Sequence, residues 1–568
     1  MNYSENSRTF KGVLVMKKRY AYGFLAICGL VLAGCTTGGN KTDGSNAAEG
    51  TSGTPQEFNV VVQQEMPTAD LSVATDTISF SALNNVFEGI YRLDKDSVPQ
   101  PAGAAEKAEV SEDGLTYKIK LREDAKWSNG DPVTAADYVY GWQRTVAPET
   151  ASEYASMFAV VANGKEIAEG SKKPEELGIK AVGDYELEIT LAKATPYFDY
   201  LLAFPSFFPL HQATVEEFGD KYAATSANAV YNGPFTLDGF DGPGTDTEWN
   251  YVKNDNYWDK DTVKLDQINV SVVKEANTAL NLFQDGQVDD VILTGELAQQ
   301  MKNDPAYIAQ PEATTYYIEL NQRDENSPYR NEDLRKAISY AIDREALVNS
   351  ILGDGSAPAV GLVPEKMTFS PTDDKDFTEE AGSVLEYNPE KAKEHWEKAK
   401  KELGIDTLEA EFLASDTDST KKLIEYLQNT LEENLDGFKV TLSPVPFSVR
   451  LDRSNAGEFD LVSSGWGADY ADASSFTNLF VTGNSYNRGG YSNPEYDKLI
   501  DEANNTYATD PEKRWDSLIK AEQTIMADQG VIPTYQKAEA HLRAEKVKGV
   551  VAHPAGAQYD YKWVTIEE

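Results

Sequence analysis

The order of polar and apolar residues along positions 58–535 is the feature that most restricts the fold. Tyr117–Leu121 and Tyr185–Leu191 alternate apolar with polar residues, which is typical of half-buried strands. Other segments place apolar residues three and four positions apart, which is typical of helices that bury one face. Strand-like and helix-like segments follow one another in turn, and no unit of roughly 20–50 residues repeats. The pattern predicts an α/β protein and excludes a solenoid.

The expected elements can be placed along the chain with their limits. Thr134 precedes a helix and has Asp137 three residues later, a variant of the capping box. Tyr138, Tyr140 and Trp142 are spaced for one helix face, and we expect them in the core. Further strands are expected at Phe58–Val62, Ile268–Val273, Val288–Leu293, Tyr316–Leu320, Leu408–Leu413, Phe438–Leu442 and Phe459–Val462, and helices at Phe80–Tyr91, Glu275–Phe283, Asn331–Leu352, Pro389–Leu403, Thr420–Glu433, Ser448–Asn455, Pro494–Ala503 and Pro511–Met526.

The N-terminal segment has the features of a signal peptide followed by a lipid-attachment site. Lys17-Lys18-Arg19 is a basic cluster, and Ala21–Val31 is an apolar run that is short for a membrane span. Leu32-Ala33-Gly34-Cys35 then resembles the lipobox of bacterial lipoproteins, in which the cysteine is lipidated and becomes the mature N-terminus. The alternative is an ordinary signal peptide in which Cys35 occurs by chance. We predict a lipoprotein signal peptide over 1–34, with either Met1 or Met16 as the start.

Residues 35–57 are rich in Gly, Ser, Thr, Asn and Ala and predict a flexible tether. A diacylglyceryl group at Cys35 would supply the two acyl chains that stable membrane attachment needs. No other stretch of the chain approaches about 18 consecutive apolar residues. The prediction is a large body attached to a cell membrane on its outer face.

Charge and residue usage exclude several classes of function. The 568 residues carry 93 acidic and 52 basic side chains, a formal charge of −41, which disfavours nucleic acid as a partner. The two cysteines, Cys28 and Cys35, give no disulfide framework, and the four histidines are too scattered for a metal site. No nucleophile elbow, phosphate loop, zinc helix or dinucleotide fingerprint is present. We therefore expect neither an enzyme nor a cofactor.

Several segments, in one order over about 480 residues, resemble the extracellular solute-binding proteins of peptide ABC importers, solute-binding family 5. The most specific is KWSNGDPVTAADYVYGWQR at Lys126–Arg144. The others are FEGIYRLD at Phe87–Asp94, NGPFTLDGF at Asn232–Phe240, LRKAISYAIDREALV at Leu334–Val348, FDLVSSGWGADY at Phe459–Tyr470, and the stretches Gly490–Ala503 and Ile532–Tyr535.

The resemblance implies a fold of two lobes with a hinge and an inserted domain, three domains in all. It assigns 58–93, 191–311 and 536–568 to a discontinuous domain of the first lobe. It assigns 94–190 to the inserted domain of that lobe and 312–535 to the second lobe. Such lobes close on their ligand by bending at a hinge.

The resemblance also implies where a peptide binds. In the family, an aspartate of the GWxADY segment pairs with the ammonium group of the ligand, and here that residue is Asp469 in Gly465–Tyr470. Extended ligands pair main chain to main chain, which tolerates many side chains. The family often has a proline four residues after this aspartate, whereas this chain has Ala473. The predicted peptide-binding residues are Asp469, Trp466, Gly465, Gly467, Thr75, Asp76, Thr77, Tyr154 and Tyr535.

Each of these residues also has a structural interpretation. Asp76 suits a helix cap, Trp466 a packing position and Asp469 a surface turn. The leading prediction is a monomeric, lipid-anchored receptor, of a Gram-positive type, that delivers oligopeptides to an ABC permease with its ATPase subunits. A dipeptide, a signalling pheromone, a nickel chelate or an oligosaccharide are alternatives within the same fold. A cell-surface hydrolase or a structural adhesin are alternatives of a different class.

Overall fold

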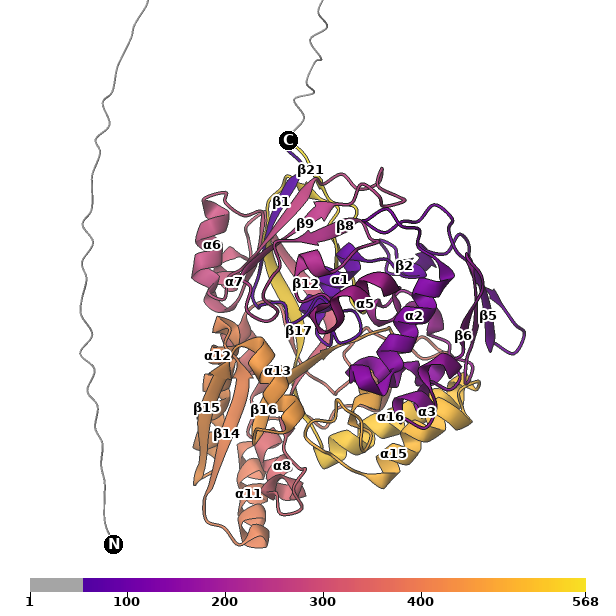
Figure 1. Cartoon of the computed structure of the whole chain (residues 1–568). Coiled ribbons are helices and arrows are strands. Elements are labelled where there is room, and N and C mark those ends of the chain that lie inside the picture. Colours follow the sequence, from indigo (N-terminus) through magenta and orange to yellow (C-terminus); the bar gives the residue numbers. More distant parts are fainter. Residues whose placement is uncertain (1–54) are drawn as a thin grey trace, which may run out of the picture. The chain divides into compact units, whose positions relative to one another are not determined.

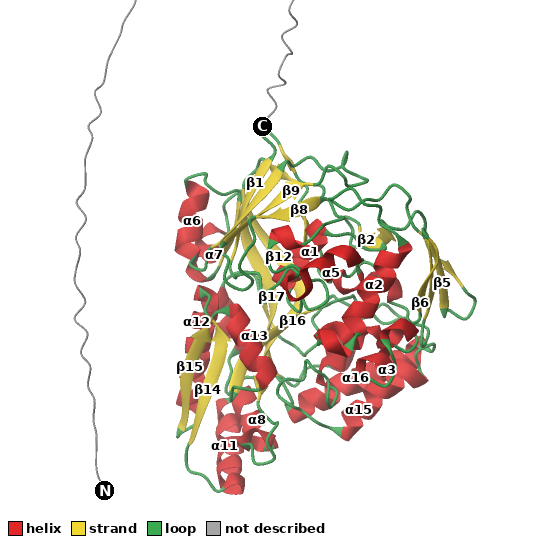
Figure 2. Ribbon diagram, viewed as in Figure 1, coloured by secondary structure: helices red, strands yellow, loops and turns green. Residues whose placement is uncertain are grey.

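The computed structural model describes residues 55–568, and its framework is one long mixed β-sheet of 11 strands (Figure 1; Figure 2). The signal peptide, Cys35 and most of the predicted tether lie outside the described residues. In sheet order the strands are β15 (Phe438–Val445), β14 (Leu408–Ser415), β16 (Leu461–Gly467), β12 (Tyr307–Leu320), β17 (Ile532–Arg543), β11 (Asp290–Leu293), β1 (Glu57–Val62), β10 (Gln267–Val272), β9 (Glu248–Lys253) and β8 (Phe235–Asp238), and β13 (Ala357–Pro358) pairs with β17 outside this order.

Strands β12 and β17 are long and link the two ends of this sheet. Toward one end β12 pairs with β16, through Thr314–Leu320, and toward the other end β17 pairs with β11. The two strands pair with each other in antiparallel fashion, and their register shifts between Pro311 and Thr315 and again between Tyr316 and Tyr317. The predicted limits between lobes, at 311/312 and 535/536, fall inside these two strands. The domain limits themselves stay a prediction.

Segment 94–190 builds its own antiparallel sheet, separate from the long one (Figure 2). The helix expected after Thr134 is present, and the carboxylate of Asp137 accepts a hydrogen bond of 2.7 Å from the Thr134 backbone N–H. Tyr138 and Trp142 are fully buried and Tyr140 is half-buried, which confirms their place in the core. The segment contains β4 (Glu109–Val110), β5 (Thr116–Lys120), β7 (Glu186–Thr190), β6 (Ile179–Gly183), α2 (Ala135–Val146), α3 (Gly164–Ala168) and the 3-10 helix η2 (Glu153–Val160).

The prediction of one continuous helix over Asn331–Leu352 is wrong, because the helix is interrupted. It ends at Tyr340, and a new helix begins only after Asp343, which has extended backbone geometry. The Asp343 side chain accepts a 2.9 Å hydrogen bond from the Ala346 N–H, so the same apolar stripe contains an internal helix cap. The two parts are α8 (Glu332–Tyr340) and α9 (Arg344–Ala346), the latter followed by a π-helical turn at Leu347–Leu352.

The helix expected over Phe80–Tyr91 is also shorter at its end. Helix α1 (Thr77–Val86) stops before Phe87, which is extended. The Gly233 N–H donates to the Val86 carbonyl oxygen at 2.9 Å, and a Cβ on Gly233 would lie 2.6 Å from the Phe87 nitrogen. The backbone at Gly233 thus donates a hydrogen bond to one of the last carbonyl groups of the helix. It can approach this closely because glycine has no side chain.

Most of the remaining elements follow the expected alternation with ends shifted by a few residues, but the strand expected at Tyr316–Leu320 is much longer and begins at Tyr307. The charged helix expected at Pro389–Leu403 has those limits. None of the helices within residues 55–568 is long and apolar enough to cross a bilayer. The other elements are α4 (Phe198–Leu201), α5 (Gln212–Phe218), α6 (Ala276–Gln284), α7 (Gly295–Met301), α10 (Phe377–Ala381), α11 (Pro389–Leu403), α12 (Asp418–Asn434), α13 (Phe447–Ala456), α14 (Ser474–Thr477), α15 (Pro494–Asp501), α16 (Pro511–Asp528), β2 (Tyr91–Leu93), β3 (Pro99–Pro101), β18 (Val547–Lys548), β19 (Val551–Ala552), β20 (Tyr559–Asp560) and β21 (Thr565–Ile566).

Candidate binding cleft

Two adjoining cavities lie beside β12 and β17, where chain segments far apart in sequence meet. The first, of about 100 Å³, is lined by the loop before α1 and by parts of β12, α13 and β16, and we call it the Asp469 cavity. The second, of about 140 Å³, is lined by parts of β1, β10, β17 and β20, and we call it the Tyr535 cavity. The residues that line both cavities are Gln64, Thr77, Tyr316, Thr420 and Lys537.

The structure brings all nine predicted binding residues to these cavities. Tyr535 lines the Tyr535 cavity, and its ring stacks on Tyr316 with the centroids 4.8 Å apart. The other eight line the Asp469 cavity: Thr75, Asp76, Thr77, Tyr154, Gly465, Trp466, Gly467 and Asp469. Shared lining places these side chains together, and their roles in binding stay predictions.

Asp469 follows Ala468, the first residue after β16, and is half-buried. Its Oδ1 accepts a hydrogen bond of 2.9 Å from the Tyr154 hydroxyl, and its backbone N–H donates to Ser475 Oγ at 2.9 Å. Burial raises the pKa of its carboxyl to about 7, which the hydrogen bond from Tyr154 offsets only in part. Within residues 55–568 no cation forms an ion pair with Asp469. The cavity thus holds an anionic site that lacks a counter-ion.

The turn after Asp469 stays ordered although Ala473 replaces the proline of the family pattern. The Asp472 carboxylate accepts hydrogen bonds from both the N–H and the hydroxyl of Ser474. Arg514 of α16 binds the same carboxylate through both of its terminal nitrogens, at 2.7 and 2.8 Å. These contacts fix the turn that positions Asp469 without help from a proline ring.

Asp76 is the N-cap of α1, as its structural interpretation predicts. Its Oδ1 accepts a 2.8 Å hydrogen bond from the Ser79 N–H. Its Oδ2 is buried and has no hydrogen-bond partner within residues 55–568, and burial raises the pKa of the carboxyl to about 6. Asp76 lines the cavity, and its two carboxylate oxygens differ. Oδ1 caps helix α1, and Oδ2 has no hydrogen-bond partner within residues 55–568.

Trp466 combines packing with cleft lining. Its ring lies parallel to that of Tyr154 at 6.4 Å and meets the edge of Tyr486 at 4.6 Å. Its indole N–H is buried without a hydrogen-bond partner in the described part of the chain. Tyr154, Trp466 and Asp469 also line a third hollow of about 810 Å³. The same three side chains thus line two hollows.

The glycines that flank Trp466 are required by the neighbouring strand. An added Cβ on Gly465 would lie 3.0 Å from the ring of Tyr316, and one on Gly467 would lie 3.1 Å from Thr314 Oγ1. Strand β16 pairs with β12 over its full length, but with β14 only at Leu461 and Val462. The opposite edge of Ser463–Gly467 therefore has no strand partner among the described residues, and it lies at the cavity.

Sequence reasoning missed the other charged residues of the Asp469 cavity. Glu312 and Lys537 form an ion pair of 3.0 Å, and Arg488 contacts Glu153 at 3.6 Å. Glu312 and Lys537 lie within two residues of the predicted lobe boundaries, and that proximity was the available signal. No sequence signal distinguishes Arg450, because Arg453 is of the same residue type and lies on the same helix, but on another face of it.

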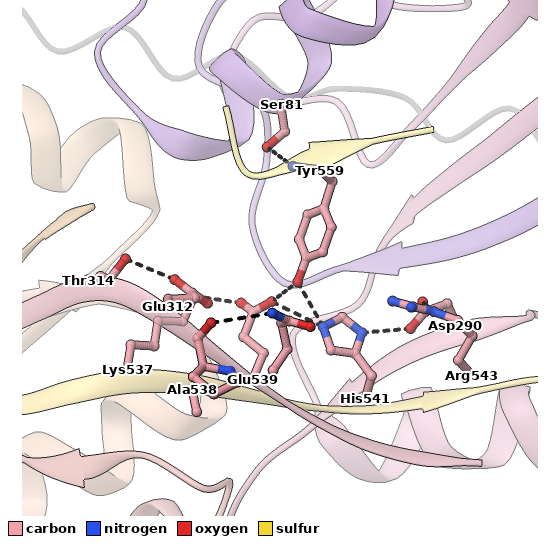
Figure 3. Close-up of polar contacts among 12 residues, drawn as sticks. Ser81, Asp290, Glu312, Thr314, Lys537, Ala538, Glu539, His541, Arg543 and Tyr559 are labelled. Atoms are coloured by element: carbon pink, nitrogen blue, oxygen red, sulfur yellow. Dashed lines mark hydrogen bonds and ion pairs between the residues drawn. The ribbon is translucent and has the colours of Figure 1, made fainter. Parts of the chain in front are cut away.

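A chain of alternating charges follows one face of β17, beside the Tyr535 cavity (Figure 3). Lys537 contacts Glu539 at 2.5 Å, and His541 contacts Glu539 at 3.3 Å and Asp290 at 2.7 Å. Arg543 completes the chain at Asp290, 2.5 Å away. Burial lowers the pKa of His541, but Asp290 and Glu539 outweigh it and raise that pKa to about 9. The charges therefore compensate one another, and this network leaves no free charge for a ligand.

The lobes expected from the sequence touch across the Asp469 cavity. Tyr154, on η2, reaches Asp469, and Glu153 accepts a 2.6 Å hydrogen bond from Asn455 of α13. Tyr197 and Tyr470 stack with their ring centroids 4.2 Å apart. Both cavities are smaller than the roughly 300–1,000 Å³ typical of ligand sites. A ligand of several residues therefore does not fit either cavity at the volume it has in this structure.

Comparison with known proteins identifies the class to which this fold and cleft belong. The family model of the bacterial extracellular solute-binding proteins, family 5 (middle), matches residues 99–488. The chain therefore belongs to the family 5 solute-binding proteins. It is 36% identical over 549 residues to a dipeptide-binding protein of Lactococcus lactis. The aligned region covers 95% of this chain and 97% of that protein.

Two solved structures carry the same fold. OppA of Listeria monocytogenes, bound to peptide, superposes with a TM-score of 0.88 at 44% identity, and the match covers 91% of this chain and all of that one. The pheromone receptor PrgZ, solved to show its mode of peptide binding, gives a TM-score of 0.87 at 42% identity, with the same coverage. The expected two-lobed α/β fold is confirmed. Proteins of this family are transport receptors, so the expectation that the chain is not an enzyme is also confirmed.

Proposed function

We propose that the chain is a lipid-anchored receptor that binds oligopeptides in the Asp469 cavity and delivers them to an ABC permease. The single observation that carries this proposal is the half-buried carboxyl of Asp469, whose pKa burial raises to about 7 and which has no counter-ion within residues 55–568. Withdrawing a carboxylate from water is costly unless a cation joins it. The N-terminal ammonium of a peptide supplies that cation, and several related proteins are named as dipeptide- or oligopeptide-binding proteins.

The peptide main chain has a place beside that charge. Ser463–Gly467 offers a strand edge without a partner among the described residues, to which an extended peptide can add as a further strand. The loop Thr75–Thr77 lies in the wall of the same cavity. The Tyr154 hydroxyl donates to Asp469 and orients the carboxylate toward the ammonium. Binding through main-chain groups and one terminal charge accepts many peptide sequences.

Release and delivery follow from the arrangement of the lobes. We place the bend in β12 and β17, whose register shifts beside the cavity. Cys35, outside the described residues, would carry the lipid that keeps the receptor at the outer face of the membrane, within reach of its permease. The ATPase subunits of the importer would supply the energy of transport, so the receptor itself needs no cofactor.

The test is to identify what the protein binds in a cell. Residues 36–568 are expressed without the signal peptide, kept native for mass spectrometry, and then denatured to release bound molecules. We expect a ladder of mixed small peptides. An empty protein that also fails to gain thermal stability from a peptide library, while it turns over a hydrolase substrate, would contradict the proposal.

A selective receptor for one short or signalling peptide is the second candidate. The related proteins include a dipeptide-binding protein and a pheromone receptor. One discrete peptide released in the same experiment would favour this candidate over broad nutrient uptake.

The affinity for peptides should peak between about pH 7 and 8. The pKa of Asp469 is about 7 in the empty cavity, and a bound ammonium lowers it, so binding releases a proton below pH 7 and weakens as the pH falls. The peptide α-amino group, with a pKa of about 7.7–8.0, loses its charge above pH 8. Titrations from pH 5 to 9 check this. An Asp469→Asn variant should lose the acidic limb, and an affinity that stays constant from pH 5.5 to 7.5 would contradict the assignment.

A further inference from the structure

Lys274 connects two strands that lie far apart in the order of the long sheet. It is the second residue after β10, and its ammonium contacts both carboxylate oxygens of Asp416, the first residue after β14, at 2.9 and 3.1 Å. Five strands lie between β10 and β14 in the sheet order, which in a flat sheet would separate them by about 29 Å at a spacing of roughly 4.8 Å. The two ends of the sheet therefore curve toward each other, and this ion pair joins them.

Glu65 completes a group of three charges around the same ammonium. It lies three residues after β1, the neighbour of β10, and its Oε1 is 2.8 Å from Lys274 Nζ. The side chains of Glu65, Lys274 and Asp416 are 12%, 22% and 25% exposed. The Asp418 N–H also donates to the Lys274 carbonyl oxygen, at 3.4 Å. We call Glu65, Lys274 and Asp416 the Lys274 clasp. Because the clasp is largely withdrawn from water, its attraction is screened less than that of an exposed ion pair.

The Lys274 clasp lies just outside the wall of the Tyr535 cavity. Gln64 and Thr417, the sequence neighbours of Glu65 and Asp416, line that cavity, whereas the three clasp residues line neither the Tyr535 cavity nor the Asp469 cavity. By the predicted limits, Glu65 and Lys274 belong to the first lobe and Asp416 to the second. The clasp thus bridges the lobes beside the space for a ligand without reaching into it.

A backbone contact joins the lobes close to the clasp. The Gly244 N–H donates to the carbonyl oxygen of Met66, which follows the clasp glutamate, at 2.8 Å. A Cβ on Gly244 would lie 2.9 Å from Oγ of Ser448 on α13, so this loop of the first lobe also packs closely on the second. By contrast, the hydrogen bond from Tyr154 to Asp469 joins two residues that line a cavity. The clasp is therefore a contact between the lobes that a substitution removes without changing a cavity wall.

We propose that the Lys274 clasp holds the two lobes together around a bound peptide and slows release of the peptide without touching it. This inference rests on the proposed function and adds to it a residue that controls how long a ligand stays bound. Opening the cleft separates Asp416 from Lys274, which then keeps only Glu65, so the clasp adds to the cost of opening. Because the clasp does not contact the ligand, its loss should speed the release of every peptide by the same factor. Lys274 is thus a positioning residue for binding.

The experiment measures how fast peptides leave residues 36–568 by surface plasmon resonance. The probes are free-amine peptides of two to five alanines, and the same lengths with one lysine, glutamate or phenylalanine at the second position. Asp416→Asn keeps the shape of the side chain and removes its charge. We expect every probe that binds to dissociate about three- to tenfold faster from Asp416→Asn than from the wild type, a range between those of exposed and fully buried ion pairs.

Three further variants assign the effect to the ion pair. Asp416→Glu retains the charge and should release peptides at a rate close to that of the wild type. Lys274→Met removes both contacts of the ammonium and should release them at least as fast as Asp416→Asn. Asp418→Asn is the matched control, because Asp418 lies two residues from Asp416 but pairs with Lys422 of its own helix at 2.9 Å, and it should release peptides at the wild-type rate. Thermal unfolding checks that each variant is folded.

The outcomes separate the clasp from the proposed function. If Asp416→Asn and Asp418→Asn release the peptides at the same rate, or if Asp416→Asn speeds the release of some peptides and not of others, the clasp is overturned and the peptide receptor stands. The same holds if Asp416→Asn lowers the unfolding temperature of the empty protein and leaves release unchanged, since that result indicates a purely structural role.

If the wild type binds none of the peptides and releases none on denaturation, both the clasp and the proposed function are overturned. If Lys274→Met does not fold, the comparison of Asp416→Asn with Asp416→Glu decides. Faster release from Asp416→Asn alone supports the clasp, and equal release from the two variants overturns it.

Discussion

Replacing Asp469 by alanine should weaken the binding of a free-amine peptide by about 2–5 kcal/mol, at least 30-fold in Kd. The substitution leaves the ammonium of the ligand buried without a partner, and Tyr154 loses the acceptor of its 2.9 Å hydrogen bond. Acetylating the peptide removes the other half of the same pair and should cost a similar amount. Isothermal titration of both proteins with both peptides gives the complete cycle.

The two losses should not add. Once Asp469 is gone, acetylation should change the affinity little, because the interaction it removes no longer exists. Asp452→Ala provides the control, since Asp452 is exposed on α13 and lines neither cavity. Tyr154→Phe should weaken binding less than Asp469→Ala. Binding of the free-amine peptide to Asp469→Ala within threefold of wild type would show that the ammonium binds elsewhere.

Periodicity placed most elements but not their limits. The alternation of apolar and polar residues is local, so β5, β7 and the charged helix α11 could be predicted from the sequence. Where the elements end depends on contacts from distant segments. Gly233 donates a hydrogen bond to the Val86 carbonyl at the end of α1. The residues around Val86 in the sequence do not predict that contact.

The sequence of β17 contains the pattern that predicts its full length, Ile532–Arg543. Lys537, Glu539, His541 and Arg543 alternate with Ala538, Ala540 and Leu542, the pattern of a strand with two different faces. Here the polar face is buried as well, because Asp290, Glu312 and Tyr559 supply partners for its charges (Figure 3). A charged face is usually exposed, so only the partners explain its burial.

The charges of the cleft divide into those that a motif reveals and those that only packing reveals. Asp469 was found because the segment around it resembles a family motif, and the structure adds that its carboxyl is half-buried, has a raised pKa and forms no ion pair within residues 55–568. Arg450 and Arg453 have the same residue type on one short helix, yet the Nε of one is buried without a hydrogen-bond partner within residues 55–568 and the other has Glu411. One side of the helix places Arg450 at the cavity and another places Arg453 beside Glu411 of β14, and no local pattern contains that difference.

Removing the carboxylate of Asp560 should destabilise the protein more than any change in the cleft. Asp560 is fully buried in β20, and its Oδ2 binds Arg92 Nε at 2.8 Å, a side chain that is 4% exposed. The remaining nitrogens of Arg92 have no hydrogen bond within residues 55–568, and Glu88 lies 3.9 Å away. Asp560→Ala therefore leaves a buried guanidinium with one distant partner, which should cost about 3–5 kcal/mol of unfolding free energy.

Urea unfolding of residues 36–568 measures this loss, and two variants test its cause. Arg92→Met combined with Asp560→Leu removes both charges and should recover much of the stability, because the penalty comes from the uncompensated charge. Glu106→Ala breaks the exposed pair with Lys120 and should change the unfolding midpoint little. The Arg92–Asp560 pair joins residues 468 positions apart, from the segments 58–93 and 536–568 that we assign to one discontinuous domain. If Asp560→Ala unfolds at the same urea concentration as Glu106→Ala, the C-terminal segment does not hold that domain together.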